Sequence, residues 1–188
     1  MLFRSLQEFW KHALATAVTS DVIARQTGLA KPEECFTCGL LHDIGKIVLL
    51  KIAPEEFLSA VELAEKEKIS FAEAERRLEI PPHGYLGEYI AEKWRLPMVI
   101  RVAIRYHHTD VSGMNTILES MKKVVHTVSL ANQLVVMENI GYSGDASGGF
   151  ASPALFEHLG LAPSSLNSIV ERVKKDFDNA SSFLRSAA

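Results

Sequence analysis

The segment Gly39–Lys46, with the sequence GLLHDIGK, sets the strongest constraint on the fold of this chain. His42 and Asp43 lie side by side directly after an apolar run. A neutral imidazole beside an ionised carboxylate is a good start for a divalent metal site. Two adjacent ligands are weak evidence alone, so the fold would have to bring others to them. The chain offers five further candidate ligands, which are Glu8, His12, His83, His107 and His108.

Apolar residues recur at helical spacing along almost the whole chain, which predicts an all-α fold. Ser5 and Glu8 form a capping box that opens a first helix, and Gly28 is a natural end for it. Pro32 favours the start of a second helix that runs to His42. The pattern predicts a compact bundle of about eight or nine helices.

The middle of the chain continues this pattern. Residues 47–52 could form a buried strand, but their helical neighbourhood favours a short buried helix. Pro54 starts the next helix, and a second capping box at Ser70 and Glu73 opens another. The segment Pro82–Arg95 is predicted to be helical. Its expected inward stripe consists of Leu86, Tyr89, Ile90 and Trp94.

The helix expected over Met98–Tyr106 ends in the pair His107 and His108. Both side chains can reach one cluster only at a helix end, because neighbouring positions on a helix point about 100° apart. A polar loop and a long helix over residues 116–138 are expected to follow. The stretch 141–149 is rich in Gly and Ser and is predicted to be a mobile loop.

The whole chain is interpreted as one domain over residues 1–188. Its motif-bearing core covers residues 5–138, and helices over residues 152–188 complete it. A length of 188 residues and a hydrophobic content of 47% suit a single domain with a sizeable core.

The net charge of −3 gives no general attraction to nucleic acid or to an anionic membrane. No apolar stretch approaches the roughly 20 residues that span a bilayer. The N-terminus lacks the features of a secretion signal, so a cytoplasmic location is expected.

Cys35 and Cys38 have CxxC spacing. They could be a redox pair or half a zinc site, but two small buried helix residues are favoured, because no second CxxC exists.

The histidines divide into two groups. His126 and His158 are interpreted as structural, because a histidine in an apolar pattern is more often a core residue than a ligand. Glu8 and His12 are four residues apart and share a helix face. Glu8 either closes the capping box or points into a site beside His12, and the capping role is slightly favoured.

A resemblance to a known family emerges from these motifs. His12 in FWKHA and the segment LLHDIGK resemble the HD superfamily of metal-dependent phosphohydrolases. The segments HGYLG from His83, WRLP from Trp94 and IRYHH up to His108 resemble its HDOD branch more closely. HDOD domains are all-α bacterial modules, and most are regulatory. The resemblance therefore implies a signal-transduction domain.

The resemblance also implies roles for single residues. The related HD-GYP phosphodiesterases carry a two-metal site. By position, Asp43 would bridge two metals, and Asn132 stands where the HD pattern has its last aspartate. Asn132 offers only a neutral carbonyl oxygen, which should lower metal affinity. The metal ligands implied by this comparison are Glu8, His12, His42, Asp43, His83, His107, His108 and Asn132.

Two departures from the family pattern concern the ends of the motif region. The GYP signature does not follow His108. HDOD proteins usually have a further helical portion before the motif that carries His12. Either this first subdomain is absent here, or the chain is part of a longer protein.

Three functions follow as hypotheses. The first is an HDOD-type regulatory module with a retained metal site, whose partner is an unknown signalling protein or a phosphorylated small molecule. The second is an active phosphohydrolase acting on a nucleotide or cyclic dinucleotide. In it Asp43 is catalytic, and Lys46 either neutralises a phosphate oxygen or is only a surface lysine. The third is a structural helical adaptor. Imidazole-rich ligation favours Fe, Mn, Zn or Ni, with one or two ions.

Overall fold

The computed structural model of the chain describes residues 6–110, 113–114, 117–146 and 151–186. The regular structure within these ranges is helical, which confirms the predicted all-α class. Every helix within them is too short or too polar to cross a bilayer. The helices are α1 (Leu6–Thr27), α2 (Pro32–Leu41), α3 (Ile44–Ile52), α4 (Pro54–Glu67), α5 (Phe71–Arg77), α6 (His83–Lys93), α7 (Met98–Tyr106), α8 (Glu119–Met137), α9 (Pro153–His158), the short 3-10 helix η2 (Pro163–Ser165) and α10 (Leu166–Ser186).

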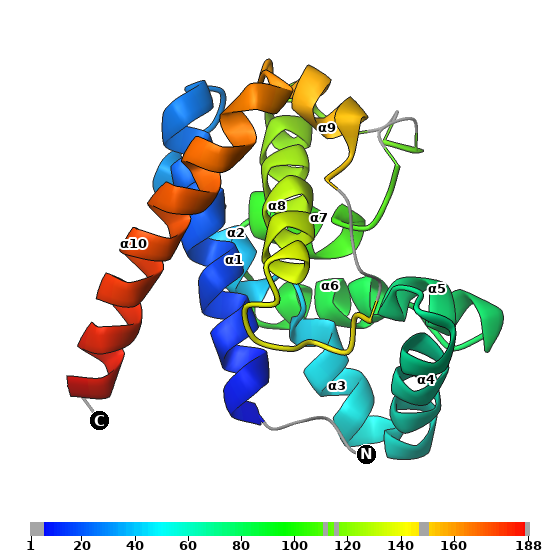
Figure 1. Cartoon of the computed structure of the whole chain (residues 1–188). Coiled ribbons are helices and arrows are strands. Elements are labelled where there is room, and N and C mark those ends of the chain that lie inside the picture. Colours follow the sequence, from blue (N-terminus) through cyan, green and yellow to red (C-terminus); the bar gives the residue numbers. More distant parts are fainter. Residues whose placement is uncertain (1–5, 111–112, 115–116, 147–150, 187–188) are drawn as a thin grey trace.

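Helix α1 packs against α2, α8 and α10. In Figure 1, α8 lies beside α1 near the centre, while α4 and α5 lie on the opposite side of the molecule from α10. Most buried positions of α1 carry small side chains, so neighbouring helices approach it closely. At Gly39 on α2, an added Cβ would lie 2.9 Å from the Cα of Ala17. This close crossing brings the end of α2, with His42, next to His12.

Helices α3 and α6 cross through a pair of glycines. A Cβ on Gly45 would lie 1.8 Å from the carbonyl oxygen of His83, and a Cβ on Gly87 would lie 3.1 Å from the Gly45 nitrogen. Tyr89 and Trp94 are 57% and 59% exposed, so their predicted place in the inward stripe is wrong. The reason is steric, because a crossing this close accepts only small side chains. The buried residues of α6 are His83, Gly84, Gly87 and Ala91.

Helices α3, α4 and α5 share an apolar cluster that includes Phe57 and Phe71. The Ser70 Oγ accepts a hydrogen bond from the Glu73 backbone N–H at 3.1 Å, as the second capping box predicts. The Glu73 carboxylate instead pairs with Arg76 and Arg77, three and four positions further along the helix. Ser5, the cap of the first box, lies outside the described residues.

Residues 141–146, here called the strap, cross the molecule after α8. The strap appears in yellow in Figure 1, where it runs from the end of α8 toward α5. The Tyr142 N–H donates to the Glu8 carbonyl at 3.0 Å, and the Tyr142 hydroxyl contacts Glu65 at 2.8 Å. Asp145 accepts from the Phe71 N–H at 2.9 Å. The strap is a loop, as predicted, but contacts with three helices hold it against the fold. The remaining residues of the predicted loop, 147–149, are not described.

Candidate metal centre

Asp43 lies at the centre of a buried cluster of histidines. Its Oδ2 lies 3.4 Å from the Nε2 of His42 and 3.8 Å from the Nε2 of His12. Its Oδ1 lies 3.3 Å from the Nε2 of His83 and 3.4 Å from the Nε2 of His107. Each of these side chains is buried. One carboxylate therefore faces two pairs of imidazoles, with one oxygen toward each pair.

We call the two sides of this cluster the first half and the second half. The first half consists of His12, His42 and Asp43, and the second half consists of Asp43, His83, His107 and His108. In each half, one candidate ligand atom per residue lies within 4.8 Å of the others. The residues come from five different helices or helix ends. The long sequence separation between them is bridged by the two close crossings at Gly39 and Gly45.

Hydrogen bonds at Nδ1 orient three of the imidazoles. The Nδ1 of His42 lies 2.6 Å from the Gly39 carbonyl, and that of His107 lies 2.9 Å from the Ile104 carbonyl. A carbonyl only accepts, so Nδ1 carries the proton and Nε2 presents its lone pair to the cluster. The Nδ1 of His83 contacts the Glu75 carboxylate at 2.8 Å. A second ring nitrogen bound to such an acceptor is typical of metal-ligating histidines.

Burial and neighbouring charges set the protonation of the cluster. Burial, reinforced by His42, lowers the pKa of His12 to about 3. Burial lowers the pKa of His107 to about 4, so both rings are neutral near pH 7. Burial also opposes a charge on His83, but Glu75 and Asp43 outweigh it and raise its pKa to about 9. Burial opposes ionisation of Asp43, yet His42 and Lys46 hold its pKa well below the usual range. Near pH 7 the cluster thus contains an ionised carboxylate, neutral rings at His12 and His107, and a protonated ring at His83 that would lose its Nε2 proton on binding a metal.

The donor set fits a divalent cation. With metal–nitrogen distances of about 2.0–2.1 Å, ligand atoms around a tetrahedral metal lie about 3.3–3.4 Å apart. In the second half, the three separations among Asp43 Oδ1, His83 Nε2 and His107 Nε2 are 3.3, 3.4 and 3.4 Å. Asp43 Oδ1 is buried and accepts no hydrogen bond within the described structure. An orphaned carboxylate oxygen among imidazole nitrogens is the environment that a cation would stabilise.

Lys46 is buried beside the first half. Its Nζ lies 2.9 Å from Asp43 Oδ2 and 2.9 Å from Asp145 Oδ2, with the Ser143 hydroxyl at 3.4 Å. Its exposed fraction is 0%, so the alternative of a surface lysine is wrong. Burial alone would favour the neutral amine, but Asp145 and Asp43 outweigh it and raise the pKa of Lys46 above its ordinary value. The ammonium is therefore a permanent positive charge next to the cluster.

The three remaining predicted ligands, His108, Asn132 and Glu8, differ in how deeply they are buried. His108 is exposed, and its ring centre lies 4.1 Å from that of His107. Asn132 is buried, and its carbonyl oxygen accepts no hydrogen bond within the described structure. It lies one turn after Ser129, whose hydroxyl donates to the His107 carbonyl at 2.7 Å. Glu8 lies at the surface, with its carboxylate 3.9 Å from the Lys11 Nζ, and it belongs to neither half.

Two residues beside the cluster were missed in the sequence. Glu75 lies in the middle of a helix, and Asp145 lies in a Gly- and Ser-rich loop. Neither position has a local pattern that indicates a buried carboxylate. Their only signal is tertiary, because Asp145 pairs with Lys46, 99 positions away, and Glu75 pairs with His83 of the next helix. His126 and His158, interpreted as structural, lie together outside the cluster, with ring centres 5.2 Å apart.

A hollow of about 270 Å³ opens beside the second half. Its lining includes His83, His107 and His108, together with Arg105 and Tyr85. The strap lies on the side of the first half, since a Cβ on Gly141 would be 2.3 Å from the backbone nitrogen of His12. The two halves therefore differ in access from solvent.

The model of the HDOD domain family matches residues 2–110. The chain belongs to the HDOD family. This match covers more than half of the sequence and includes His12, His42, Asp43, His83, His107 and His108. It ends before the strap and before Asn132, so the family assignment says nothing of Asp145.

Solved HDOD-like structures share this fold. An HDOD domain protein of unknown function from Geobacter sulfurreducens is 26% identical, with a TM-score of 0.67 over 95% of this chain and 60% of that one. A candidate signal transduction protein from Marinobacter aquaeolei VT8 is 22% identical, with a TM-score of 0.74 over 95% and 39%. A candidate phosphohydrolase from Shewanella amazonensis SB2B is 20% identical, with a TM-score of 0.67 over 91% and 60%. The chain thus spans 39% to 60% of the length of these HDOD-like proteins.

Proposed function

We propose that this chain is a regulatory HDOD module of signal transduction whose buried His/Asp cluster holds a divalent metal ion. The observation that carries the proposal is the arrangement around Asp43. Both carboxylate oxygens face imidazole nitrogens at 3.3–3.8 Å, and hydrogen bonds at Nδ1 turn the Nε2 atoms of His42 and His107 inward. Imidazole nitrogens and an ionised oxygen thus converge in a buried cluster, and a hollow opens onto its second half. The cluster gathers residues from α1 and α6 and from the ends of α2, α3 and α7.

The signalling role is supported by the family and by the structural likeness to the candidate signal transduction protein of Marinobacter aquaeolei. A metal that joins several helices is a suitable element for regulation, because its binding would favour one arrangement of these helices. The candidate ligands are His12, His42 and Asp43 in the first half, and Asp43, His83, His107 and His108 in the second half. When bound, the ion would supply a Lewis acid that polarises a phosphate ester and acidifies water.

The test is metal binding by untagged protein in equilibrium dialysis against Ni²⁺, with bound metal counted by mass spectrometry. The wild-type chain is expected to bind Ni²⁺. Asp43→Asn keeps the size of the side chain but removes its charge, and it should weaken binding at least about tenfold. His158→Gln is the matched control, because His158 is an exposed histidine outside the cluster. Equal binding by wild type and Asp43→Asn would overturn the proposal.

A phosphohydrolase activity is the second candidate, and the hollow beside the second half favours it. The hollow gives solvent access to His83, His107 and His108, and Arg105 belongs to its lining. A cation and open access beside a metal site suit a phosphate ester. Metal-loaded protein should be assayed with bis(p-nitrophenyl) phosphate and with cyclic dinucleotides. Turnover that disappears in Asp43→Asn would support an enzyme, and no turnover with any substrate would leave the regulatory module.

A further inference from the structure

The two oxygens of Asp43 have different environments. Oδ2 accepts a hydrogen bond from the Lys46 ammonium at 2.9 Å, whereas Oδ1 accepts none within the described structure. The first half therefore already contains a positive charge on its carboxylate oxygen. The second half has a carboxylate oxygen that accepts no hydrogen bond within the described structure, and it has three imidazoles where the first half has two. A metal there would take the place of the proton on the His83 Nε2, which lies 3.3 Å from this oxygen.

Lys46 is fixed in this position by groups outside the cluster. Asp145 holds the same Nζ at 2.9 Å, and the Ser143 hydroxyl lies at 3.4 Å. Asp145 is itself anchored by the Phe71 N–H, and the Phe71 ring lies 5.0 Å from the Nζ. A buried ammonium between two carboxylates is costly to displace, because removing it would leave Asp145 without a countercharge. A dication at Oδ2 would have to expel Lys46 or tolerate its repulsion.

Access from solvent also favours the second half as the metal site. The strap packs against the backbone of His12, beside the first half, while the hollow of about 270 Å³ opens onto the second half. The first half is thus the less accessible of the two.

We propose that this centre binds one metal ion, in the second half, and that Lys46 held by Asp145 takes the place of a second cation in the first half. The inference rests on the proposed metal function and specifies its stoichiometry. Asp43 then bridges a metal on Oδ1 and an ammonium on Oδ2. Asp145 is a positioning residue that keeps the ammonium in place and ties the strap to the site.

The experiment is a count of Ni²⁺ bound per chain at saturation, by equilibrium dialysis of untagged protein. Wild type is expected to bind one ion. Lys46→Met should raise the count to two. The substitution removes the ammonium from the first half and leaves the carboxylates of Asp43 and Asp145 without their countercharge. Lys51→Met, on the exposed end of the same helix, is the matched control and should bind one ion. Circular dichroism verifies that each variant is folded.

A second pair of variants keeps Lys46 and does not depend on the folding of Lys46→Met. His107→Gln should weaken binding of the single ion at least about tenfold, whereas His12→Gln should change it less than about threefold. Two ions per wild-type chain, or greater weakening by His12→Gln than by His107→Gln, would overturn the inference while the proposed metal function stands. No ion bound by wild type or by Lys46→Met would overturn both.

Discussion

Glu75 acts on the cluster through His83, because its carboxylate accepts both the ring Nδ1–H and the backbone N–H of that residue. Such a partner makes the imidazole a stronger ligand and fixes its orientation. Glu75→Gln should therefore weaken metal binding about tenfold to a hundredfold in dialysis. Glu73→Gln is the matched control on the same helix, since Glu73 pairs with surface arginines. Equal effects of the two variants would contradict this role for Glu75.

The two cysteines are expected to be unreactive. Burial raises the pKa of the Cys35 thiol to about 12 and also raises that of Cys38, so the reactive thiolate is almost absent at pH 8. Iodoacetamide at pH 8 should label the native protein at least about tenfold more slowly than the unfolded protein. Mass spectrometry measures both rates. Rapid labelling of the folded chain would restore the redox interpretation of the CxxC.

At the scale of single residues, sequence reasoning succeeded where a motif was local and was incomplete where partners were distant. The adjacency of His42 and Asp43 indicated a ligand pair, and the structure brings His12, His83 and His107 to it. The burial of Lys46 was not predictable, because it depends on Asp145, 99 positions further along the chain. The choice of ligands stays a prediction until a metal is bound.

Among the elements, the crossing of α3 and α6 controls how Asp43 meets His83. Gly45→Ala places a methyl group 1.8 Å from the His83 carbonyl oxygen, so the two helices must separate. The variant should lose about 3 kcal/mol of unfolding free energy. Urea denaturation followed by circular dichroism measures this loss. Glu62→Ala, on the exposed face of α4, should change stability by less than about 0.5 kcal/mol. A Gly45→Ala protein as stable as wild type would show that the crossing is looser.

The same crossing explains why the positions of the helices could be predicted better than the faces that they turn inward. Prolines, caps and helical spacing indicated where helices begin and end, and these signals are local. The inward face of α6 was assigned to large apolar residues, whereas glycine, alanine and histidine face inward. A close crossing selects small residues, and hydrophobicity alone does not reveal it.

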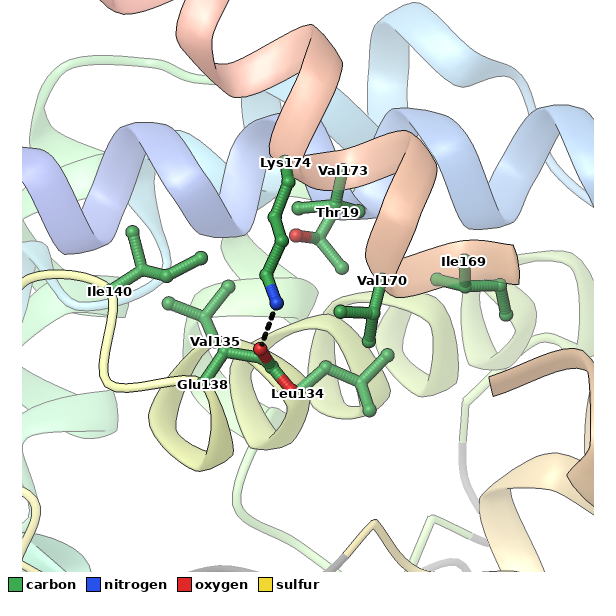
Figure 2. Close-up of a pocket in the computed structure, with 9 residues that line it drawn as sticks. All are labelled: Thr19, Leu134, Val135, Glu138, Ile140, Ile169, Val170, Val173 and Lys174. Carbon is green, nitrogen blue, oxygen red and sulfur yellow. Dashed lines mark ion pairs between the residues drawn. The ribbon is translucent and has the colours of Figure 1, made fainter. Parts of the chain in front are cut away.

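For the molecule as a whole, α10 closes the bundle against α1 and α8. Figure 2 shows Ile169, Val170 and Val173 of α10 beside Leu134 and Val135 of α8, around a small apolar pocket. A salt bridge between Lys174 and Glu138, at 2.8 Å, lies at its edge. The apolar contacts should dominate, because exposed ion pairs contribute little and Ile169 is fully buried.

Two variants separate these contributions to the docking of α10. Ile169→Ala should lose about 2–5 kcal/mol of unfolding free energy, through lost burial and the cavity that remains. Lys174→Ala should lose less than about 1 kcal/mol, since its side chain is 58% exposed. Thermal unfolding at two salt concentrations compares them. A larger effect for Lys174→Ala, abolished by salt, would mean that charge attaches α10.

The central claim is that helices from across the chain deliver imidazoles and one carboxylate to a common metal. X-ray absorption at the metal edge of Ni²⁺-loaded, untagged protein tests it most directly, because imidazole rings give characteristic multiple scattering. We expect a shell of nitrogen and oxygen with about three imidazoles, from His83, His107 and His108. Sulfur scatterers from Cys35 and Cys38, or a shell without imidazole, would contradict it.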